Sequence, residues 1–182
     1  MPTLNEAALI EVALRALAPL RALGHEVIVV DGGSEDGTPD LAMPLADRVL
    51  GASRGRARQM NAGASMATGE VLVFLHADTR LPPCADGVIF RSLEKHLWGR
   101  FDVRIEGAHP LLRVVGLAMN LRSRLTGIAT GDQAIFVRRA DFAGFPDMPL
   151  MEDIAFSKAM KRRGPPACID AKALTSGRRW ER

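Results

Sequence analysis

The sequence predicts an α/β fold in which a mostly parallel, doubly wound central sheet is flanked by helices. Two unbroken apolar runs, EVIVVD at residues 26–31 and EVLVFLHAD at residues 70–78, are typical of strands buried on both faces. Helix signals lie before, between and after these runs, at residues 5–17, from residue 38 and at residues 55–68. Strands that alternate with helices in this order predict parallel pairing through crossover connections.

Local signals support each element. Asn5 is expected to cap the helix at 5–17, and Pro19 and Gly24 close that region. The turn-rich GGSEDGTP is followed by a helix that starts at Thr38 and Pro39, and RVL at 48–50 is expected to form a short strand. Past residue 82 the pattern is looser, and we expect strands at 101–105 and 134–138 and helices at 110–124 and 152–163.

The opening segment MPTLNEA has the turn chemistry that follows a strand, yet only Met1 precedes it. We therefore expect a truncated first strand near the centre of the sheet. No repeat, linker or change of composition divides the chain, so residues 1–182 are expected to form a single domain.

Composition is that of an ordinary globular protein, with 47% hydrophobic and 25% charged residues in 182. Cys84 and Cys168 lie far apart without metal-type spacing, which favours a reduced, cytoplasmic protein. The sequence shows no secretory leader, and no stretch has the length and apolar character of a membrane span.

The net charge is only +3, but basic residues gather at 54–58, 122–124, 158–163 and 178–182. Such groups suit small phosphorylated ligands or an anionic membrane surface. Aromatic residues make up 5% of the chain and tyrosine is absent, so the base-stacking surface of a single-strand nucleic-acid binder is not expected. We expect no nucleic-acid partner, and a location in the cytoplasm or peripherally at the inner membrane face.

Three polar segments follow predicted strands: the turn at residues 3–6, Asp31 after VIVV and Asp78 after VLVFL. Ligands of open α/β sheets bind beyond the carboxyl ends of the strands. One such residue alone is more often a turn former or a helix cap, but three at one edge favour a ligand site.

Two charged segments add to this hypothesis while leaving alternatives open. Arginines in RGRARQ at 54–59 begin a helix where an anion is favoured, so they either point into solvent or hold a phosphate. Asp78 either binds a divalent cation or forms a turn before Thr79. Glu152 and Asp153 open a helix that ends in basic residues, which suits the helix dipole by itself. Because neighbouring helical residues point about 100° apart, at most one of the two carboxylates is expected to face a pocket.

Taken together, six blocks resemble a family 2 glycosyltransferase with the GT-A fold, closest to the bacterial subgroup that carries HADT and GRFDVR blocks. The blocks are PTLNEA, VVDGGSEDGT, RGRARQMNAGA, LHADTRLP, GDQAIFVRR and LMEDIAFSKAMKRRG, which are collinear with the family and span nearly the whole chain. The resemblance implies transfer of a sugar with inversion, from a nucleotide-sugar that is expected to be UDP-linked to an unidentified hydroxyl, which a lipid could carry.

The resemblance also implies that residues 1–80 form the nucleotide-binding half of the domain and residues 81–182 its acceptor and catalytic half, and it implies roles for individual residues. Asp153 would be the catalytic base, and Asp78 would hold the divalent metal, Mn²⁺ or Mg²⁺. The remaining implied contacts are to the nucleotide from Pro2, Thr3, Leu4, Asn5, Glu6, Asp31, Arg58 and Ala77, and to the sugar or acceptor from Trp98, Gly131, Asp132, Gln133 and Glu152. For Trp98 a core position is an equal alternative. His76 stands where many relatives have an acid, and it would either bind the ion or pack, of which we favour packing.

Two other functions remain open. A nucleotidyltransferase has a similar fold but usually a Gly-rich phosphate loop at its amino end, which PTLNEA lacks. A non-catalytic nucleotide-sugar or membrane-surface binding module would have no use for a base at Asp153. An oxidoreductase is disfavoured because no G-x-G-x-x-G follows the strand at 27–30.

Overall fold

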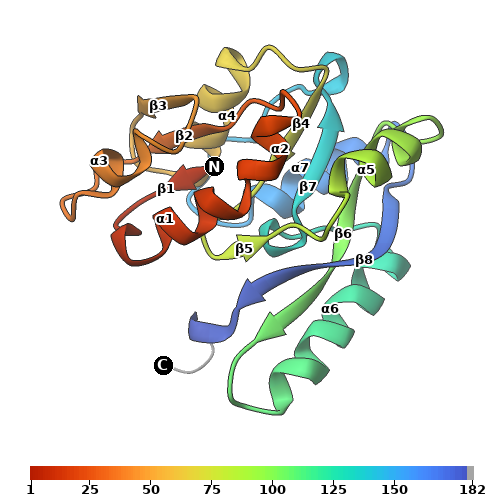
Figure 1. The fold of residues 1–182 in the computed structure, drawn as a ribbon. Helices are drawn as coiled ribbons and strands as arrows, with labels where there is room; N and C mark the ends of the chain where they lie inside the picture. Colours follow the sequence, from red (N-terminus) through yellow and green to blue (C-terminus); the bar gives the residue numbers. More distant parts are fainter. Residues whose placement is uncertain (180–182) are drawn as a thin grey trace.

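The structure, a computed structural model, describes residues 1–179 and shows two sheets flanked by helices (Figure 1). Sheet A is parallel and has the order β1-β2-β3, and sheet B is mixed and has the order β4-β7-β6-β8-β5. The strands are β1 Pro2–Thr3, β2 Ile28–Asp31, β3 Arg48–Gly51, β4 Val71–Phe74, β5 Thr79–Arg80, β6 Trp98–Glu106, β7 Ile135–Arg138 and β8 Ala167–Ser176. The predicted α/β class is confirmed, and β1, β2 and β3 are parallel as expected. The strand β4 was expected in the same parallel sheet, but it lies in sheet B and pairs antiparallel with β7.

The helices lie between these strands in sequence. They are α1 Ala7–Ala16, α2 Ala18–Ala22, α3 Thr38–Ala42, α4 Arg56–Met66, α5 Ala85–Leu93, α6 Leu111–Thr126 and α7 Glu152–Lys161. Three short 3₁₀ turns complete the description: η1 Gly131–Gln133, η2 Arg139–Asp141 and η3 Gly177–Arg179. Of the described helices, none is long and apolar enough to cross a lipid bilayer.

The first strand is two residues long, as the opening segment predicted. Pro2 and Thr3 pair with Val30 and Asp31 of β2. The terminal ammonium of Met1 donates to the carbonyl oxygen of Ile28 at 2.8 Å, so it lies inside the fold. Among the described residues, no backbone pairing joins sheet A to sheet B, and an apolar cavity of about 370 Å³ lies between β2 and β4.

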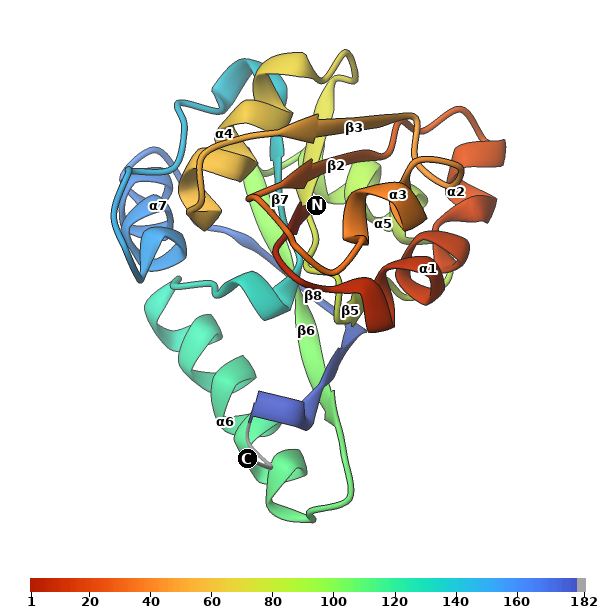
Figure 2. The ribbon, with the colours of Figure 1, turned by 90° about the vertical axis from the view of Figure 1, so that its left-hand side faces the viewer.

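Sheet B differs from a wholly parallel sheet. β7 runs antiparallel to both β4 and β6, whereas β6 and β8 run parallel over most of their lengths. The strands β5 and β8 and the helix α5 had no clear sequence signal; β8 shows burial on alternate residues only over part of its length. In Figures 1 and 2 the ends of β6 and β8 project beyond the rest of the molecule, with α6 alongside.

The start of α1 corrects one expectation. Asn5 is not the cap: it has a φ of 52°, and its side-chain oxygen accepts a hydrogen bond from the Glu35 N–H at 2.9 Å. The free N–H groups of Glu6 and Ala7 instead donate to Thr38 Oγ1 and Asp36 Oδ2, each at 2.9 Å. Polar groups from the turn after β2 thus satisfy the helix end and fix the loop at residues 4–6 against sheet A.

Two large apolar clusters hold the layers together. The first packs α1 and α5 against both sheets, with Leu14, Val29 and Phe101 almost fully buried. The second lies between sheet B and the helices α4 and α7, and it contains a group of aromatic rings. Within it the Phe145 ring lies 4.7 Å from that of Phe74 and 4.6 Å from that of Phe156, measured between centroids.

Candidate active site

Three potential metal ligands meet where β4 ends and β7 begins. His76 and Asp78 follow β4, and Asp132 lies in η1 just before β7, so the antiparallel pairing of these strands brings the three together. Each offers one ligand atom, and all three atoms lie within 4.8 Å of one another. We call His76, Asp78 and Asp132 the metal group. The sequence predicted only Asp78 as a ligand; Asp132 was expected to contact sugar or acceptor.

The chemistry of this group fits a divalent cation. The His76 Nδ1 atom is buried and has no hydrogen-bond partner among the described residues, and it lies 3.5 Å from Asp132 Oδ1. A buried nitrogen that makes no hydrogen bond is costly, and a bound cation would satisfy it. Carboxylate oxygens with one imidazole suit Mn²⁺ better than Ca²⁺. The expectation that His76 merely packs is therefore not favoured.

Gly131 makes room for the His76 ring. A Cβ atom at residue 131 would lie 2.3 Å from His76 Cε1 and 2.5 Å from Nε2, far inside contact distance. Only glycine leaves the imidazole in its present position. Gly131 therefore sets the place of a potential ligand, a role distinct from the sugar contact that the sequence suggested.

Asp153 lies beside the metal group through η1. Its Oδ2 atom accepts a hydrogen bond from the Gly131 N–H at 2.8 Å, and its Oδ1 accepts one from the Ile154 N–H at 2.7 Å. Glu152, the preceding residue, is buried with 4% exposure, while Asp153 is half-buried. Glu152 is thus the more buried of the two, and the expectation that at most one of them faces a pocket stays a prediction. Each Asp153 oxygen keeps a lone pair for a further donor.

A second cavity, of about 290 Å³, adjoins the metal group. Its lining combines the first loop, the start of α4 and the turn after β4: Pro2, Thr3, Leu4, Glu6, Arg54, Gly55, Arg56, Gln59, His76, Ala77 and Asp78. Six of the residues predicted for nucleotide or metal, Pro2, Thr3, Leu4, Glu6, Ala77 and Asp78, are in this lining. Gln59 joins the first loop to β2, because its Nε2 donates to the carbonyl oxygens of Thr3 and Val30, both at 2.8 Å.

Arg58 is a correction. It is outside the lining of this cavity, and its guanidinium pairs with the exposed Asp147, with Nε 2.9 Å from Oδ1. Arg54 and Arg56 line the cavity instead. The structure therefore brings Arg54 and Arg56, and not Arg58, to the cavity, and an anion site at this segment stays a prediction. Gly55, just before α4, has a φ of 141°, and the spacing of residues in the sequence does not predict this backbone conformation.

Asp31 serves the local turn. Its carboxylate accepts hydrogen bonds from the N–H groups of Gly33 and Ser34, at 2.9 and 2.8 Å, and from the Ser34 hydroxyl. Asp31 is 6% exposed and, like Asn5, is outside the cavity lining. Its observed contacts match the turn-forming alternative, and a contact with the nucleoside stays a prediction.

Arg178 was not expected at the site. Its guanidinium pairs with Glu6 at 2.6 Å and lies 3.7 Å from the Asp78 carboxylate. It belongs to the basic group predicted at 178–182, of which residues 180–182 lie outside the described residues. Since Glu6 and Arg178 are 172 positions apart, no local pattern could have linked them. The site thus contains a cation, next to one of the predicted metal ligands, from the last described turn of the chain.

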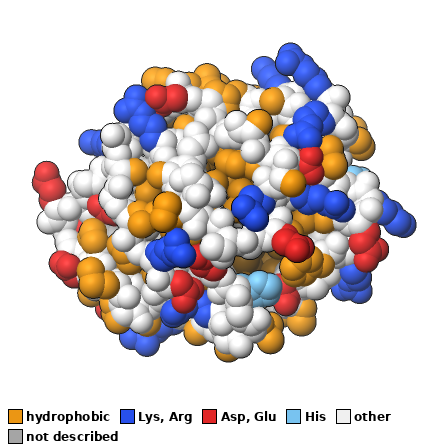
Figure 3. Space-filling model, turned by 90° about the horizontal axis from the view of Figure 1, so that it is seen from above, with side chains coloured by type: hydrophobic (Ala, Val, Ile, Leu, Met, Phe, Trp, Pro, Cys, Tyr) orange, Lys and Arg blue, Asp and Glu red, His pale blue; other side chains and the backbone are white. Residues whose placement is uncertain are grey.

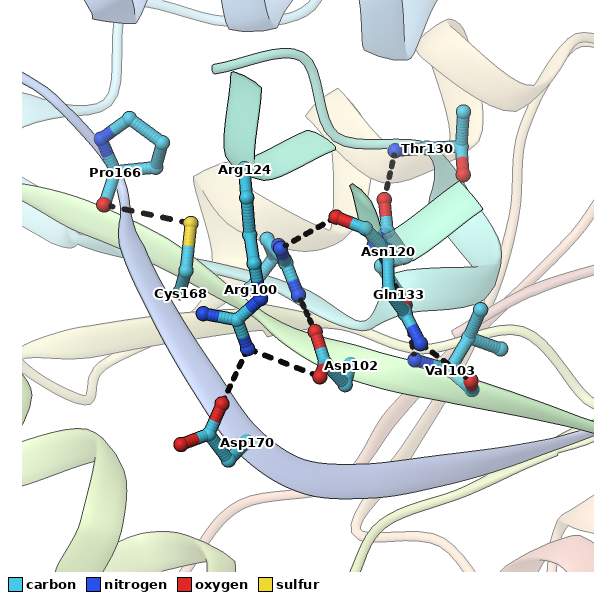
Figure 4. A network of polar contacts seen from close by, with 10 residues as sticks. All are labelled: Arg100, Asp102, Val103, Asn120, Arg124, Thr130, Gln133, Pro166, Cys168 and Asp170. Carbon is cyan, nitrogen blue, oxygen red and sulfur yellow. Dashed lines mark hydrogen bonds and ion pairs between the residues drawn. The ribbon is translucent and has the colours of Figure 1, made fainter. Parts of the chain in front are cut away.

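A buried polar network holds η1 and α6 to the long strand β6 (Figure 4). The side-chain amide of Asn120, on α6, pairs with both backbone groups of Val103: its Oδ1 accepts from the N–H at 2.8 Å and its Nδ2 donates to the carbonyl at 2.9 Å. Gln133 Nε2 donates to the same Asn120 Oδ1 at 3.4 Å, and Gln133 Oε1 accepts from the Thr130 N–H at 3.2 Å. The network therefore fixes the segment that carries Gly131 and Asp132.

Charged residues of the GRFDVR block extend this network. Arg100 is fully buried and pairs with Asp102, whose other oxygen accepts from Arg124 at 2.9 Å (Figure 4). Arg124 also pairs with Asp170 on β8. This block is therefore structural: it ties α6 to the strands β6 and β8.

Two predicted ligand contacts are corrected by their burial. Trp98 has 0% exposure, its indole N–H donates to the Gly164 carbonyl at 3.1 Å, and its ring packs edge-on against Phe156. Trp98 thus takes the core alternative. Gln133 also has 0% exposure, and its side-chain amide is hydrogen-bonded within the network, so it positions η1 and does not reach a ligand.

On the face that Figure 3 shows, the described basic residues do not gather in one patch. In the view of Figure 3, lysine and arginine side chains are spread over the face among acidic ones, and apolar atoms show in a hollow near its centre. Several arginines are neutralised by ion pairs, including Arg21 with Asp47 and Arg163 with Asp141. A general attraction to polyanions is thus less supported than local anion sites.

Solved structures share this fold. Structures of glucosyl-3-phosphoglycerate synthase from Mycobacterium tuberculosis superpose with a TM-score of 0.68; the one in complex with Mn²⁺, uridine-diphosphate and phosphoglyceric acid is 22% identical and covers 94% of this chain and 66% of that chain. Another, described as a mycobacterial protein, gives a TM-score of 0.66 at 21% identity and covers 96% of this chain and 63% of that chain. The fold is that of a GT-A glycosyltransferase.

Sequence comparison gives the family. The family model described as Glycosyl transferase family 2 matches residues 1–145. The chain therefore belongs to glycosyl transferase family 2. Relatives include the PGL/p-HBAD biosynthesis glycosyltransferases of Mycobacterium tuberculosis and Mycobacterium bovis, 38% identical over 88 residues. That match covers 44% of this chain and 34% of the relative, so the chain matches about a third of their length.

Proposed function

We propose that the protein transfers a sugar, with inversion, from a UDP-linked donor to an acceptor hydroxyl with the help of a divalent metal. One observation carries the proposal. Asp153 Oδ2 accepts the N–H of Gly131, and the next residue, Asp132, belongs to the metal group. A candidate base and a candidate metal site are thus joined by one short turn. The Mn²⁺ and UDP named for the structurally similar synthase support this choice of donor and metal.

The donor would lie in the 290 Å³ cavity. Arg54 and Arg56 line it together with the metal group residues His76 and Asp78, so it offers positive charge and metal ligands to a diphosphate. A metal ion held by His76, Asp78 and Asp132 would neutralise charge that builds on the departing diphosphate. The first loop, fixed by Gln59 and by the turn after β2, would position the nucleoside.

Asp153 would act as the base. Its two backbone hydrogen bonds hold the carboxylate at a fixed orientation, and it would take the proton of the acceptor hydroxyl as that oxygen attacks the anomeric carbon from the face opposite the diphosphate. Positioned base catalysis contributes about 10² to 10⁴ in rate. An Asp153→Asn variant keeps the size of the side chain and should lose about that factor in transfer while still binding UDP.

The acceptor is expected to have an apolar part. Leu150 and Met151, directly before Glu152 and Asp153, are 71% and 64% exposed, so apolar surface borders the candidate base. A lipid-linked hydroxyl would fit this border. Peripheral membrane association and a cytoplasmic location are predictions of the same kind.

One observation favours the second candidate, a non-catalytic nucleotide-sugar binding module. Both carboxylate oxygens of Asp153 already accept backbone hydrogen bonds, as a purely structural helix-start residue would. A nucleotidyltransferase has no comparable support in the structure.

Titration calorimetry and a turnover assay separate these functions. UDP is titrated into the wild type and Asp78→Ala with and without Mn²⁺, and then release of UDP from UDP-glucose is measured for the wild type, Asp153→Asn and the exposed control Asp40→Asn. Metal-dependent UDP binding that Asp78→Ala loses, with turnover that only Asp153→Asn loses, supports the proposal. Binding without turnover favours the binding module, and absence of UDP binding contradicts both.

A further inference from the structure

An apolar stripe runs along the outer side of α6. Five residues spaced three or four apart are 59% to 78% exposed: Leu111, Val114, Leu117, Leu121 and Leu125. The opposite side of the helix is buried on β6 through Leu112, Gly116, Asn120 and Ser123. In both ribbon views α6 is the outermost element at its end of the molecule, and no described element covers its outer side (Figures 1 and 2).

Such a stripe is unusual for a surface helix. A helix normally turns its apolar residues inward and its charged residues to water. Here the inner side already holds a polar clamp, the Asn120 amide on Val103, and the outer side carries the bulk of the leucines. The two hydrogen bonds of Asn120 to Val103 fix the rotation of α6 about its axis, and this rotation turns the stripe outward. Contiguous exposed apolar surface marks an interaction site.

The charges on α6 indicate its partner. The helix contains no acidic residue. At about 100° per residue, Arg113 and Arg122 lie on opposite borders of the stripe. Both are exposed, and neither is in an ion pair within the part of the chain that the structure describes. An apolar face bordered by arginines is the pattern of a helix that lies in the interface of an anionic bilayer, where the arginine stems follow the apolar surface and the heads meet phosphate.

We propose that the outer face of α6 binds the surface of an anionic lipid bilayer, with the leucine stripe among the acyl chains and Arg113 and Arg122 at the headgroups. A second copy of the chain fits less well, because a twofold pairing of two such stripes would bring the arginine borders together without an acidic partner on either helix. The proposal goes beyond sugar transfer, and it stands whether or not the enzyme activity does.

Binding there would also orient the candidate active site. Asn120 joins α6 to β6 and, through Gln133, to the segment that carries Asp132 (Figure 4). The lipid-facing helix and part of the metal group therefore belong to one rigid unit. A bilayer that holds α6 would fix the distance between that unit and any acceptor anchored in the same bilayer.

Vesicle co-sedimentation tests the proposal. The probe is vesicles of equal parts phosphatidylcholine and phosphatidylglycerol, with phosphatidylcholine alone as the neutral arm. The double variant Leu117→Glu/Leu121→Glu changes residues that are 62% and 59% exposed, and the matched control Val12→Glu/Leu23→Glu changes two that are 60% and 69% exposed elsewhere. Both add the same negative charge, and thermal melting checks that both stay folded.

We expect the wild type to bind the anionic vesicles, the α6 variant to lose about tenfold or more in affinity, and the control to bind nearly as the wild type does. Arg113→Gln/Arg122→Gln should weaken binding to anionic vesicles only, and added salt should reproduce that effect. Failure of the wild type to bind, or equal losses in the α6 variant and the control, overturns the proposal. So does a wild-type dimer in sedimentation velocity that Leu117→Glu/Leu121→Glu dissociates, because a second copy would then cover the stripe.

Discussion

Replacing Gly131 by alanine should remove His76 from the metal group. The new Cβ would lie 2.3 Å from His76 Cε1, whereas carbon atoms in contact are about 3.5 Å apart, so the ring must move by about 1.2 Å. His76 is only 7% exposed, which leaves the ring little space to move without losing its orientation. Metal–ligand distances tolerate about 0.2 Å. The displaced imidazole could then no longer serve as a ligand.

The expected result is a loss of Mn²⁺ affinity of about tenfold or more, equivalent to about 1.4 kcal/mol. Mn²⁺ binding is measured by calorimetry, and by the paramagnetic resonance of free Mn²⁺. Gly87→Ala is the matched control: no atom lies within 4 Å of a Cβ there, and alanine in the interior of α5 should stabilise the fold by about 0.5–1 kcal/mol. Both variants should melt cooperatively.

A double-mutant cycle shows whether Gly131→Ala lowers Mn²⁺ affinity through the His76 imidazole. If Gly131→Ala acts through the imidazole, it should have almost no further effect on Mn²⁺ affinity when His76 is already alanine. Full Mn²⁺ affinity in folded Gly131→Ala would refute the reasoning, because it would show that His76 is not a ligand. An equal further loss in the His76→Ala background would show that the methyl group acts through the backbone of η1 instead.

Three further predictions concern the fold and the site. Burial lowers the pKa of the Met1 ammonium from 8.0 to about 5. Between these two pH values the unfolded chain holds this proton and the folded chain does not, so folding becomes more favourable as the pH rises. The free energy of unfolding of the 182-residue chain should therefore rise by about 2 kcal/mol from pH 6 to pH 8. Urea unfolding measures this, and a slope that Nα-acetylation leaves unchanged would contradict it. Gly99→Ala would place a Cβ 2.4 Å from Phe136 Cζ and 2.7 Å from the Ala167 Cβ, and should destabilise the fold by about 1–3 kcal/mol in the same assay; an unchanged midpoint would show that sheet B adapts at no cost. Arg178→Gln removes the cation 3.7 Å from Asp78, and because Arg178 is partly exposed we expect Mn²⁺ affinity without nucleotide to rise by no more than about fivefold; a fall would mean that Arg178 supports the metal group.

Local patterns in the sequence predicted the parts of the fold that local chemistry decides. The runs EVIVVD and EVLVFLHAD became β2 and β4, because uninterrupted β-branched and apolar residues suit a strand covered on both faces. The helices at 56–66 and 111–126 also lie close to their predicted ranges. By contrast, β8 pairs with β6 across almost seventy positions, and β5 consists of two residues that pair only with β8. Neither has a pattern that identifies it before the partner strands are placed.

The site shows the same division. The turn at residues 3–6 and Asp78 were singled out by their places at strand ends, where short-range rules operate, whereas Pro2 and the choice of Asp153 over Glu152 came from the family resemblance. Long-range packing determined the rest. Asp132 joins His76 because β4 and β7 are antiparallel neighbours, and Trp98 is buried because Phe156 and Gly164 close over it. The direction of α4 after Gly55 decides that Arg56 lines the cavity and Arg58 does not, and the sequence does not predict that direction.

The place of β8 in sheet B has a consequence for the order in which the molecule folds. β8 lies between β6 and β5, and the Ser176 N–H donates to the Asp78 carbonyl at 3.0 Å while Thr79 and Thr175 hydroxyls meet at 3.0 Å. During synthesis the turn that carries Asp78 therefore has no strand to pair with until residues 167–176 emerge. Contacts that close such long loops form slowly. The metal group should accordingly be among the last parts to assemble, and a nascent chain that lacks β8 should have no working site for the ion.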